Sequence, residues 1–330
     1  MLTAPSGEVF AAGLFSTPTL GELRTKGRAL LCRPGETTVT LTHVTTEDVL
    51  GKHSQAQPGS VFLAASGLNC LEFPGLGCSP TLGVTCYEHD FTQGPACALA
   101  CAAGTIVRNY FSENSPNHQI DCLATLADAI GGGYAAHTPW IVQAGYVQGC
   151  KKDGPAAKAA LDEANTNFLK GPSRSALRAL VRVGVQADTG ITFTSRWKRI
   201  ERRGLEAPRV TQVYVAALSL GGYKTPRDVP NESWTPLATL VLEAAYEATL
   251  WTAVIAAARA SVKRATVYFC GLGLGVFGNE RSWVAHAIGR AVAILRKEGA
   301  ELDVVFLHFR EINAALRREI DDAIAAVHEA

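Results

Sequence analysis

The sequence has almost no net charge, since its 31 lysines and arginines face 30 aspartates and glutamates. A chain without a broad positive field does not attract nucleic acid or an anionic membrane through its overall charge, so any anion site must be local. The basic run over 196–209 has few aromatic residues between its charges, and a solvated hairpin explains it better than a nucleic-acid surface. We therefore expect no nucleic-acid partner.

Long uncharged hydrophobic runs are missing as well. No apolar segment typical of a signal peptide stands at the start of the sequence, and the longest apolar helical pattern, 237–260, is interrupted by Glu243, Glu247 and Arg259. These absences predict a soluble, cytoplasmic protein without a membrane partner, and we expect a monomer. The apolar content of 47% is sufficient for a full hydrophobic core.

The nine cysteines lack the closely spaced C-x₂-C pairs that most zinc sites use. Most of them lie inside apolar runs, as Cys270 does, which is typical of reduced thiols in a core. Cys70, Cys78 and Cys86 recur every eight residues with His89 close by, but this spacing is wider than that of structural zinc sites. We expect no metal and no cofactor.

The most informative stretch is 265–279, where an uncharged, β-branched and aromatic segment predicts a buried strand. Four glycines follow it directly: Gly271, Gly273, Gly275 and Gly278. Helical spacing of apolar residues then runs over 282–295. Glycines at such a junction let backbone N–H groups approach a ligand, and the helix N-terminus adds partial positive charge. A phosphate or diphosphate is the expected ligand, and a tight turn without a ligand is the alternative.

The spacing Gly273-x-Gly275-x-x-Gly278 also matches the dinucleotide fingerprint of dehydrogenases. Too little chain follows it for the strands that a dinucleotide fold needs, and no acidic residue ends the next strand. That strand, 302–308, is followed by Phe309, which suggests a base stacked on a ring. An NAD(P)-dependent oxidoreductase is therefore the weakest of our alternatives.

Strands that alternate with helices predict a three-layer α/β/α sandwich around a mixed, mostly parallel sheet. No linker divides the chain, so we expect one domain over 1–330. Residues 1–60 are interpreted as a peripheral N-terminal extension, and 148–210 as an insertion of helices and a hairpin. Glu243 and Glu247 lie one helical turn apart; they could ligate a metal or act as acid and base, but a hydrated helix face or a structural anchor for buried backbone groups is the commoner role.

A long proline- and glycine-rich connection, 73–94, follows a predicted strand over 61–66. Connections of this length inside a compact domain are commonly functional. It carries polar and aromatic side chains close together: Tyr87, Glu88, His89, Asp90, Thr92 and Gln93. Pro95 is a good first residue for a helix over 95–111.

The sequence from the strand through Gly-Leu-Gly-Leu-Gly-Val-Phe-Gly-Asn to Phe309 resembles the C-terminal half of a macrodomain, the ADP-ribose-binding fold. The segments 64–69 and 87–95 are similar to a divergent macrodomain branch that includes effector-type ADP-ribosylhydrolases. The two blocks, 61–111 and 211–309, cover about half of the chain.

This resemblance implies that the glycine loop wraps a diphosphate, that Phe309 stacks on adenine and that the first loop approaches the distal ribose. The implied catalytic residues are Asp90, our first choice, and Glu88. The implied ADP-ribose-binding residues are Asn69, Thr92, Gln93, Gly271, Gly273, Gly275, Val276, Phe277, Gly278, Asn279 and Phe309.

The resemblance thus implies an ADP-ribosyl glycohydrolase that removes ADP-ribose from modified protein side chains, with arginine favoured, and partners that are ADP-ribose or an ADP-ribosylated protein. The first loop departs from the common pattern, because it lacks the Asn-Ala-Ala-Asn and Gly-Gly-Gly-Val signatures. Leu82 also stands where the branch usually carries an acidic residue. A non-catalytic ADP-ribose-binding module is therefore the main alternative.

Overall fold

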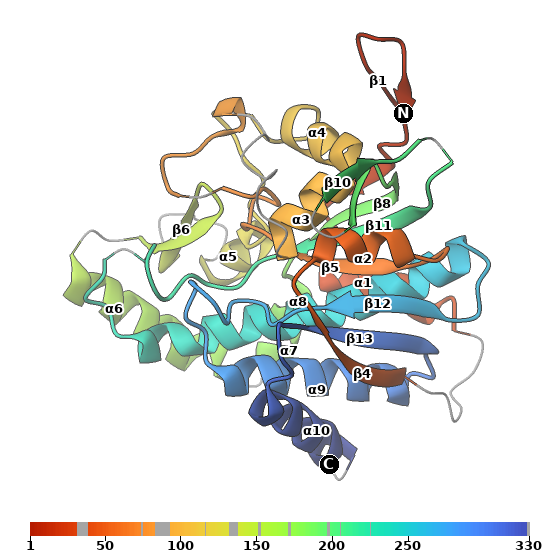
Figure 1. The fold of residues 1–330 in the computed structure, drawn as a ribbon. Coiled ribbons are helices and arrows are strands. Elements are labelled where there is room, and N and C mark those ends of the chain that lie inside the picture. The colour runs from red at the N-terminus through yellow and green to blue at the C-terminus, as the bar shows by residue number, and fades with distance from the viewer. Residues whose placement is uncertain are drawn as a thin grey trace.

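Seven strands form the central sheet of the protein, seen here as a computed structural model, in the order β3–β8–β11–β5–β12–β13–β4 (Figure 1). Their bounds in this order are Leu14–Ser16, Gly184–Gly190, Arg209–Val215, Val61–Ala65, Ala265–Phe269, Leu302–Phe309 and Val39–Thr46. The structure describes residues 1–330 except 32–38, 74, 83–92, 116, 132–137, 151–152, 171–172, 197–198, 205, 225 and 329–330.

The strands from β11 to β4 are parallel to one another, whereas β8 and β3 are antiparallel to their neighbours. β5 and β12 contain no charged residue and are almost completely buried, as expected for parallel strands that are covered on both faces. The predicted mixed, mostly parallel sheet is confirmed. Because these strands are parallel, the carboxyl ends of β5, β12, β13 and β4 meet at one edge of the sheet.

Helices cover both faces of the sheet, which confirms the predicted three layers. α3 and α4 pack on one face together with α2, whereas α8 and α9 pack on the other, with α1 and α7 against α8 and α10 against α9 (Figure 1). The helices are α1 (Leu20–Arg28), α2 (Val49–Lys52), α3 (Gln93–Ala100), α4 (Ala102–Tyr110), α5 (Ala124–Gly131), α6 (Gly154–Ala164), α7 (Arg174–Ala179), α8 (Asn231–Arg259), α9 (Arg281–Lys297) and α10 (Ala314–His328). Small hairpins are formed by β1 (Leu2–Thr3) with β2 (Val9–Phe10), β6 (Trp140–Gln143) with β7 (Tyr146–Gly149), and β9 (Phe193–Arg196) with β10 (Arg199–Arg202).

Two segments that the sequence suggested were accessory contribute strands to the central sheet. β3 and β4 form its two edges, so residues 14–16 and 39–46 are not a peripheral extension. β8 pairs with β11, so 184–190 belongs to the sheet and not to an insertion. Edge strands are less buried than central ones. β4 accordingly contains several partly exposed threonines, so its sequence lacks the continuous apolar run that identifies a central strand.

The single helix predicted over 95–111 is two helices, α3 and α4. The chain breaks at Cys101, whose φ of −112° and ψ of 55° are not helical. The carbonyl of Ala100 accepts a hydrogen bond of 2.7 Å from the N–H of Thr192. This long-range bond explains the break, which has no local signal in the sequence.

α8 is the central helix of the core. Within the described part of the chain it is also the one helix with the length and apolarity of a membrane span, and the apolar window that meets this criterion is completely buried. A helix that is apolar all round is typical of a protein interior as well as of a membrane.

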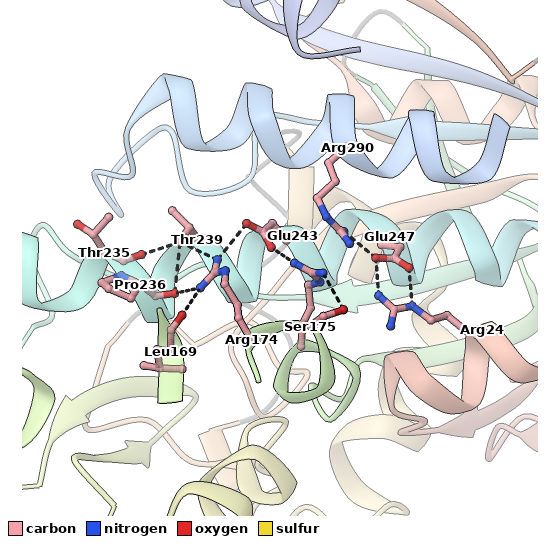
Figure 2. Close-up of polar contacts among 11 residues, drawn as sticks. Arg24, Leu169, Arg174, Ser175, Thr235, Pro236, Thr239, Glu243, Glu247 and Arg290 are labelled. Carbon is pink, nitrogen blue, oxygen red and sulfur yellow. Dashed lines mark hydrogen bonds and ion pairs between the residues drawn. The ribbon is translucent and has the colours of Figure 1, made fainter. Parts of the chain in front are cut away.

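The carboxylates of Glu243 and Glu247 project from this buried helix into clusters of arginines (Figure 2). Glu243 binds Arg174 at 2.9 Å and also binds Arg178, both from α7. Glu247 accepts two hydrogen bonds from Arg24 of α1, at 2.6 and 2.8 Å, and one from Arg290 of α9, at 2.8 Å. The two carboxylates therefore anchor three helices to α8; the partners are arginine side chains, and the predicted partners of a structural anchor were backbone groups.

Removal of the Glu247 charge should destabilise the fold strongly. In Glu247→Gln, the guanidinium groups of Arg24 and Arg290 lose their carboxylate while they remain largely buried. We expect the free energy of unfolding to fall by about 3–5 kcal/mol in urea titrations. Asp188→Asn, which breaks the exposed pair with Arg209, is the matched control and should change stability by about 0.5 kcal/mol or less. Equal effects of the two substitutions would contradict the anchoring role.

The same cluster should make stability sensitive to acid. Burial alone raises the pKa of Glu247, but the hydrogen bond from Arg24 and the charges of Arg290 and Arg24 outweigh burial and lower the pKa to about 2. An unfolded glutamate titrates near pH 4.3, so the stabilisation is complete above about pH 5 and is lost as the pH falls toward 2. Unfolding experiments from pH 7 to pH 3 should show the stability gap between wild type and Glu247→Gln narrowing. A gap that stays constant over this range would refute this assignment.

Candidate functional site

A cleft of about 540 Å³ opens where the carboxyl ends of β5, β12, β13 and β4 meet. Its walls include Ala65 at the end of β5, Gln93 at the start of α3, residues 270–275 after β12, and Phe306–Phe309 at the end of β13. In open α/β sheets, this edge is where ligands bind. Each wall therefore comes from a segment whose position is fixed by the central sheet.

The glycine loop after β12, 271–278, is a series of tight turns. The N–H of Asn279 donates to the carbonyl of Gly273 at 3.0 Å, and the N–H of Gly278 donates to that of Gly275 at 3.0 Å. Among the residues that the structure describes, no acceptor is bonded to the N–H groups of Gly275, Val276 and Phe277. Successive free N–H groups in such a turn form a concave site that suits an anion.

Two glycines of this loop have different roles. Gly273 has a φ of +78°, and a Cβ atom on it would lie 2.6 Å from the Cβ of Ala217 and 2.7 Å from Nδ2 of Asn279. Gly273 is therefore required for the turn and for close packing. A Cβ on Gly275 would meet nothing within 4 Å, so its backbone faces open space at the cleft.

The hydroxyl of Tyr246, on α8, fixes the start of the loop. It donates to the carbonyl of Cys270 at 2.7 Å and accepts from the N–H of Leu272 at 2.9 Å. The ring is completely buried, and burial raises the pKa of Tyr246 well above its ordinary value. A neutral hydroxyl that both donates and accepts thus connects the core helix to the cleft.

The far end of the loop points away from the cleft and packs on other segments. The side-chain amide of Asn279 donates to the carbonyl of Leu218 at 2.7 Å, and the residue is buried. The carbonyl of Phe277 accepts from the N–H of Leu220 at 2.8 Å, and its ring lies 5.8 Å from that of Tyr146. These contacts connect the loop to 218–220, the segment that follows β11.

Phe309 is an exposed aromatic ring at the rim of the cleft, with 57% of its surface accessible. The guanidinium of Arg310 lies 4.9 Å from the ring centroid and is bound to Glu47 at 2.8 Å. Arg310 has a φ of +64°, an unfavourable value for a residue with a side chain. Backbone strain of this kind persists where the surroundings fix the chain, and it often occurs at ligand sites.

Two histidines lie beneath this rim. Nδ1 of His308 accepts from the N–H of Asn313 at 3.3 Å, so its Nε2 carries the proton and donates to Nδ1 of His43 at 2.8 Å. Burial, followed by the neighbouring His43, lowers the pKa of His308 to about 4. The pair is neutral near pH 7, so it supports the wall of the cleft without adding charge.

Gln93 lies at the opposite side of the cleft, at the first residue of α3. Its Oε1 accepts from the N–H of Ala65 at 3.4 Å, whereas its Nε2 is buried and has no acceptor among the described residues. The next residue, Gly94, presses on the end of β5, because a Cβ there would lie 1.9 Å from the carbonyl oxygen of Ala65. Gln93 therefore places an amide donor beside the cleft.

Asn69 has a structural position in the first loop. It is completely buried; its Nδ2 donates to Oε1 of Gln119 at 2.7 Å and its Oδ1 accepts from the N–H of Leu71 at 3.1 Å. A Cβ on Gly145 would lie 2.5 Å from that Oδ1, so no open space adjoins this oxygen. Its bonds hold the loop after β5 in shape.

The structure thus brings together Gln93, Gly271, Gly273, Gly275 and Phe309 along one cleft. Five other predicted binding residues lie outside its lining: Asn69, Val276, Phe277, Gly278 and Asn279. Asp90, Glu88 and Thr92, together with His89 and Cys86, lie outside the described residues. Leu82 ends a short helical turn and is exposed.

Sequence reasoning missed Glu47 and Arg310, which hold each other beside the Phe309 ring. A signal was available for both, because Glu47 directly follows β4 and Arg310 directly follows β13. The described residues hold no group of three or more His, Cys, Asp or Glu side chains that could bind a metal ion. Cys70 lies instead 3.5 Å from Cys122, sulfur to sulfur, in the core.

Comparisons with known proteins give distant matches. No protein-family model and no curated protein matches the sequence. The chain is similar to the apo crystal structure of poly(ADP-ribose) glycohydrolase from Deinococcus radiodurans, with 11% identity, a TM-score of 0.44 and coverage of 95% of this chain and 93% of that chain. A complex of the same enzyme with ADP-ribose gives 14% identity, a TM-score of 0.42 and coverage of 95% and 94%. A mutant poly(ADP-ribose) glycohydrolase from Thermomonospora curvata is 14% identical, with a TM-score of 0.40 and coverage of 98% of this chain and 92% of that chain. At these values the chemistry of this chain has to be argued from its own cleft.

Substitutions in the glycine loop should distinguish Gly273, which is tightly packed, from Gly275, which faces open space. Gly273→Ala introduces a clash with Ala217 at a positive φ, and we expect a loss of about 2–4 kcal/mol in the free energy of unfolding. Gly275→Ala, the matched control, places its methyl group in open space and should change stability by about 0.5 kcal/mol or less. Chemical denaturation of the two variants measures the difference. Similar losses in both would show that this description of the loop is wrong.

Proposed function

We propose that the protein is an ADP-ribosyl glycohydrolase, which removes ADP-ribose from modified protein side chains. One observation carries the proposal: the glycine loop through Gly275, whose N–H has no acceptor among the described residues, and the exposed Phe309 line the same cleft. A diphosphate requires donors at close range, and a base requires the face of a ring. A ligand that has a base at one end and a diphosphate in the middle would use both features.

The size and charge of the cleft support this ligand class. A volume of about 540 Å³ falls within the range of clefts that bind ligands of this size. The sequence has no net positive field, so affinity for a diphosphate must come from local donors such as the loop N–H groups. Gln93 adds a buried amide donor on the β5 side, where the second ribose of the ligand would lie.

Catalysis in this proposal depends on carboxylates near the distal ribose. Breaking the bond at C1″ of that ribose develops positive charge on the sugar, which a carboxylate stabilises while it or a second group activates water. The loop that leads into Gln93 carries Asp90 and Glu88 in the sequence. Asp90 is the first candidate for this role, and arginine is the side chain that we favour as the carrier of ADP-ribose.

The second candidate function is a module that binds ADP-ribose without cleaving its conjugates. Leu82 favours it, because an exposed apolar side chain occupies the position where the resembling branch usually carries an acidic one. An NAD(P)-dependent oxidoreductase remains the weakest alternative, since only one strand of the sheet, β13, follows the glycine loop within the described residues.

The proposal predicts that wild-type protein binds ADP-ribose in calorimetric titrations and releases it from ADP-ribosylated arginine or glutamate proteins. Asp90→Asn should abolish the release of ADP-ribose and preserve the affinity for ADP-ribose. In this proposal the substitution removes the catalytic charge and no contact to the adenine base. Phe309→Ala should weaken binding by about fivefold to 150-fold, because ring stacking contributes about 1–3 kcal/mol.

Phe10→Ala is the matched control for the ring, since Phe10 also has an arginine guanidinium over it, that of Arg202 at 5.5 Å. Binding without release from either substrate would favour the non-catalytic module. Absence of ADP-ribose binding by wild type would overturn the proposal as a whole.

A further inference from the structure

Glu72 lies in a rigid position at the end of the first loop. This loop leaves β5 and folds back at once, with the N–H of Gly67 donating to the carbonyl of Leu71 at 2.8 Å. The buried Arg108 stabilises this turn, because its Nε donates to the carbonyl of Cys70 at 2.6 Å. Cys70 has a φ of +63°, so the chain direction before Glu72 is fixed at the expense of local strain.

The carboxylate of Glu72 lies against the first turn of α3. A Cβ placed on Gly94 would meet Oε1 of Glu72 at 2.6 Å and its Cδ at 2.9 Å, and the same Cβ would meet the carbonyl oxygen of Ala65. Ala65 and Gln93, on either side of this contact, both line the cleft. The carboxylate therefore lies beside two residues that line the β5 side of the cleft, although Glu72 is not itself one of the lining residues.

The field of this carboxylate reaches the glycine loop. Burial raises the pKa of Cys270, and the charge of Glu72 is the next contribution. Cys270 lines the cleft and directly precedes Gly271. The pKa of Tyr146, whose ring packs on Phe277, is raised mainly by burial and by the neighbouring Tyr223. The charge of Glu72 is the next cause of this increase. The charge of Glu72 thus acts on Cys270, at the start of the glycine loop, and on Tyr146, which packs on that loop.

The sheet determines how far this position is from Phe309. β12 separates β5 from β13, so the end of β5, beside which Glu72 lies, and the end of β13, which carries Phe309, are two strand spacings apart, roughly 10 Å. The glycine loop, which follows β12, lies between them. A ligand with its base on Phe309 and its diphosphate on that loop would extend its second ribose toward Glu72.

We propose that Glu72 is a further catalytic residue, which contacts the distal ribose and serves as the base for the attacking water. This inference rests on the proposed function. Water attacks C1″, the bond from C1″ to the side-chain nitrogen or oxygen breaks, and its electron pair stays on that heteroatom. Glu72 takes one proton from the water and later returns it to solvent, and the leaving heteroatom takes up one proton. The products are ADP-ribose and the unmodified side chain.

Glu72→Gln keeps the shape of the side chain and removes the base. We expect kcat for release of ADP-ribose to fall at least 100-fold, with the Kd for ADP-ribose changed less than threefold. Glu163→Gln, at an exposed glutamate on α6, is the matched control and should retain wild-type kcat. Urea unfolding of both variants checks that each is folded before it is assayed.

Chemical rescue distinguishes a base from a structural support. In Glu72→Ala, added formate should restore at least a tenfold gain in kcat, because a small carboxylate can occupy the vacated position, whereas chloride at equal ionic strength should not. A folded Glu72→Gln with wild-type kcat, or an impaired Glu72→Ala that formate does not rescue, would overturn the inference. Wild-type protein that neither binds nor releases ADP-ribose would instead overturn the proposed function on which it rests.

Discussion

The geometry of the cleft depends on one hydroxyl group in the core. Tyr246 holds both the carbonyl of Cys270 and the N–H of Leu272, so the glycine loop starts from a point fixed to α8. α8 is in turn fixed by the arginines that surround Glu243 and Glu247. The buried ion pairs thus fix α8, and the Tyr246 hydroxyl on α8 fixes the glycine loop. A loop that is already fixed loses less conformational entropy when it binds a ligand.

The second constraint is the contact between α3 and β5. Gly94 leaves no room for a side chain against the carbonyl oxygen of Ala65, so the first turn of α3 lies directly on the end of the strand. β5 and β12 are neighbours in the sheet although some 200 residues separate them in the sequence. Two loops from distant parts of the chain therefore face each other across one cleft.

Much of this architecture was accessible from the sequence, because its signals are local. The uncharged strand 265–269, its glycines and Phe309 each follow from a short pattern, and the structure places three of the four glycines and the ring at one cleft. The place of β3 and β4 at the edges of the sheet was not predicted, since it depends on pairing with distant strands. A short, half-buried strand has no pattern that identifies its partner.

The roles of individual polar residues were the least predictable part. Asn69 carried the chemistry of a ligand-binding side chain, but its partners, Gln119 and Leu71, hold the loop together. The sequence left catalysis open for Glu247 as the less common role, and the arginines of α1 and α9 show that its carboxylate is a structural anchor. Spacing along a helix gives the face on which a carboxylate lies, but not the residues that approach that face from elsewhere in the chain.

The pairing of β4 with β13 has a consequence for how the molecule forms. Residues 39–46 lie beside 302–309, so the wall of the cleft at the Phe309 side is assembled from segments near the two ends of the sequence. During synthesis, β4 leaves the ribosome long before its partner exists and must wait with an unsatisfied edge. The cleft is therefore among the last features to form. Because the pairing of β4 with β13 closes a loop of about 250 residues, it is slow, and we expect the complete site to form in a single late step.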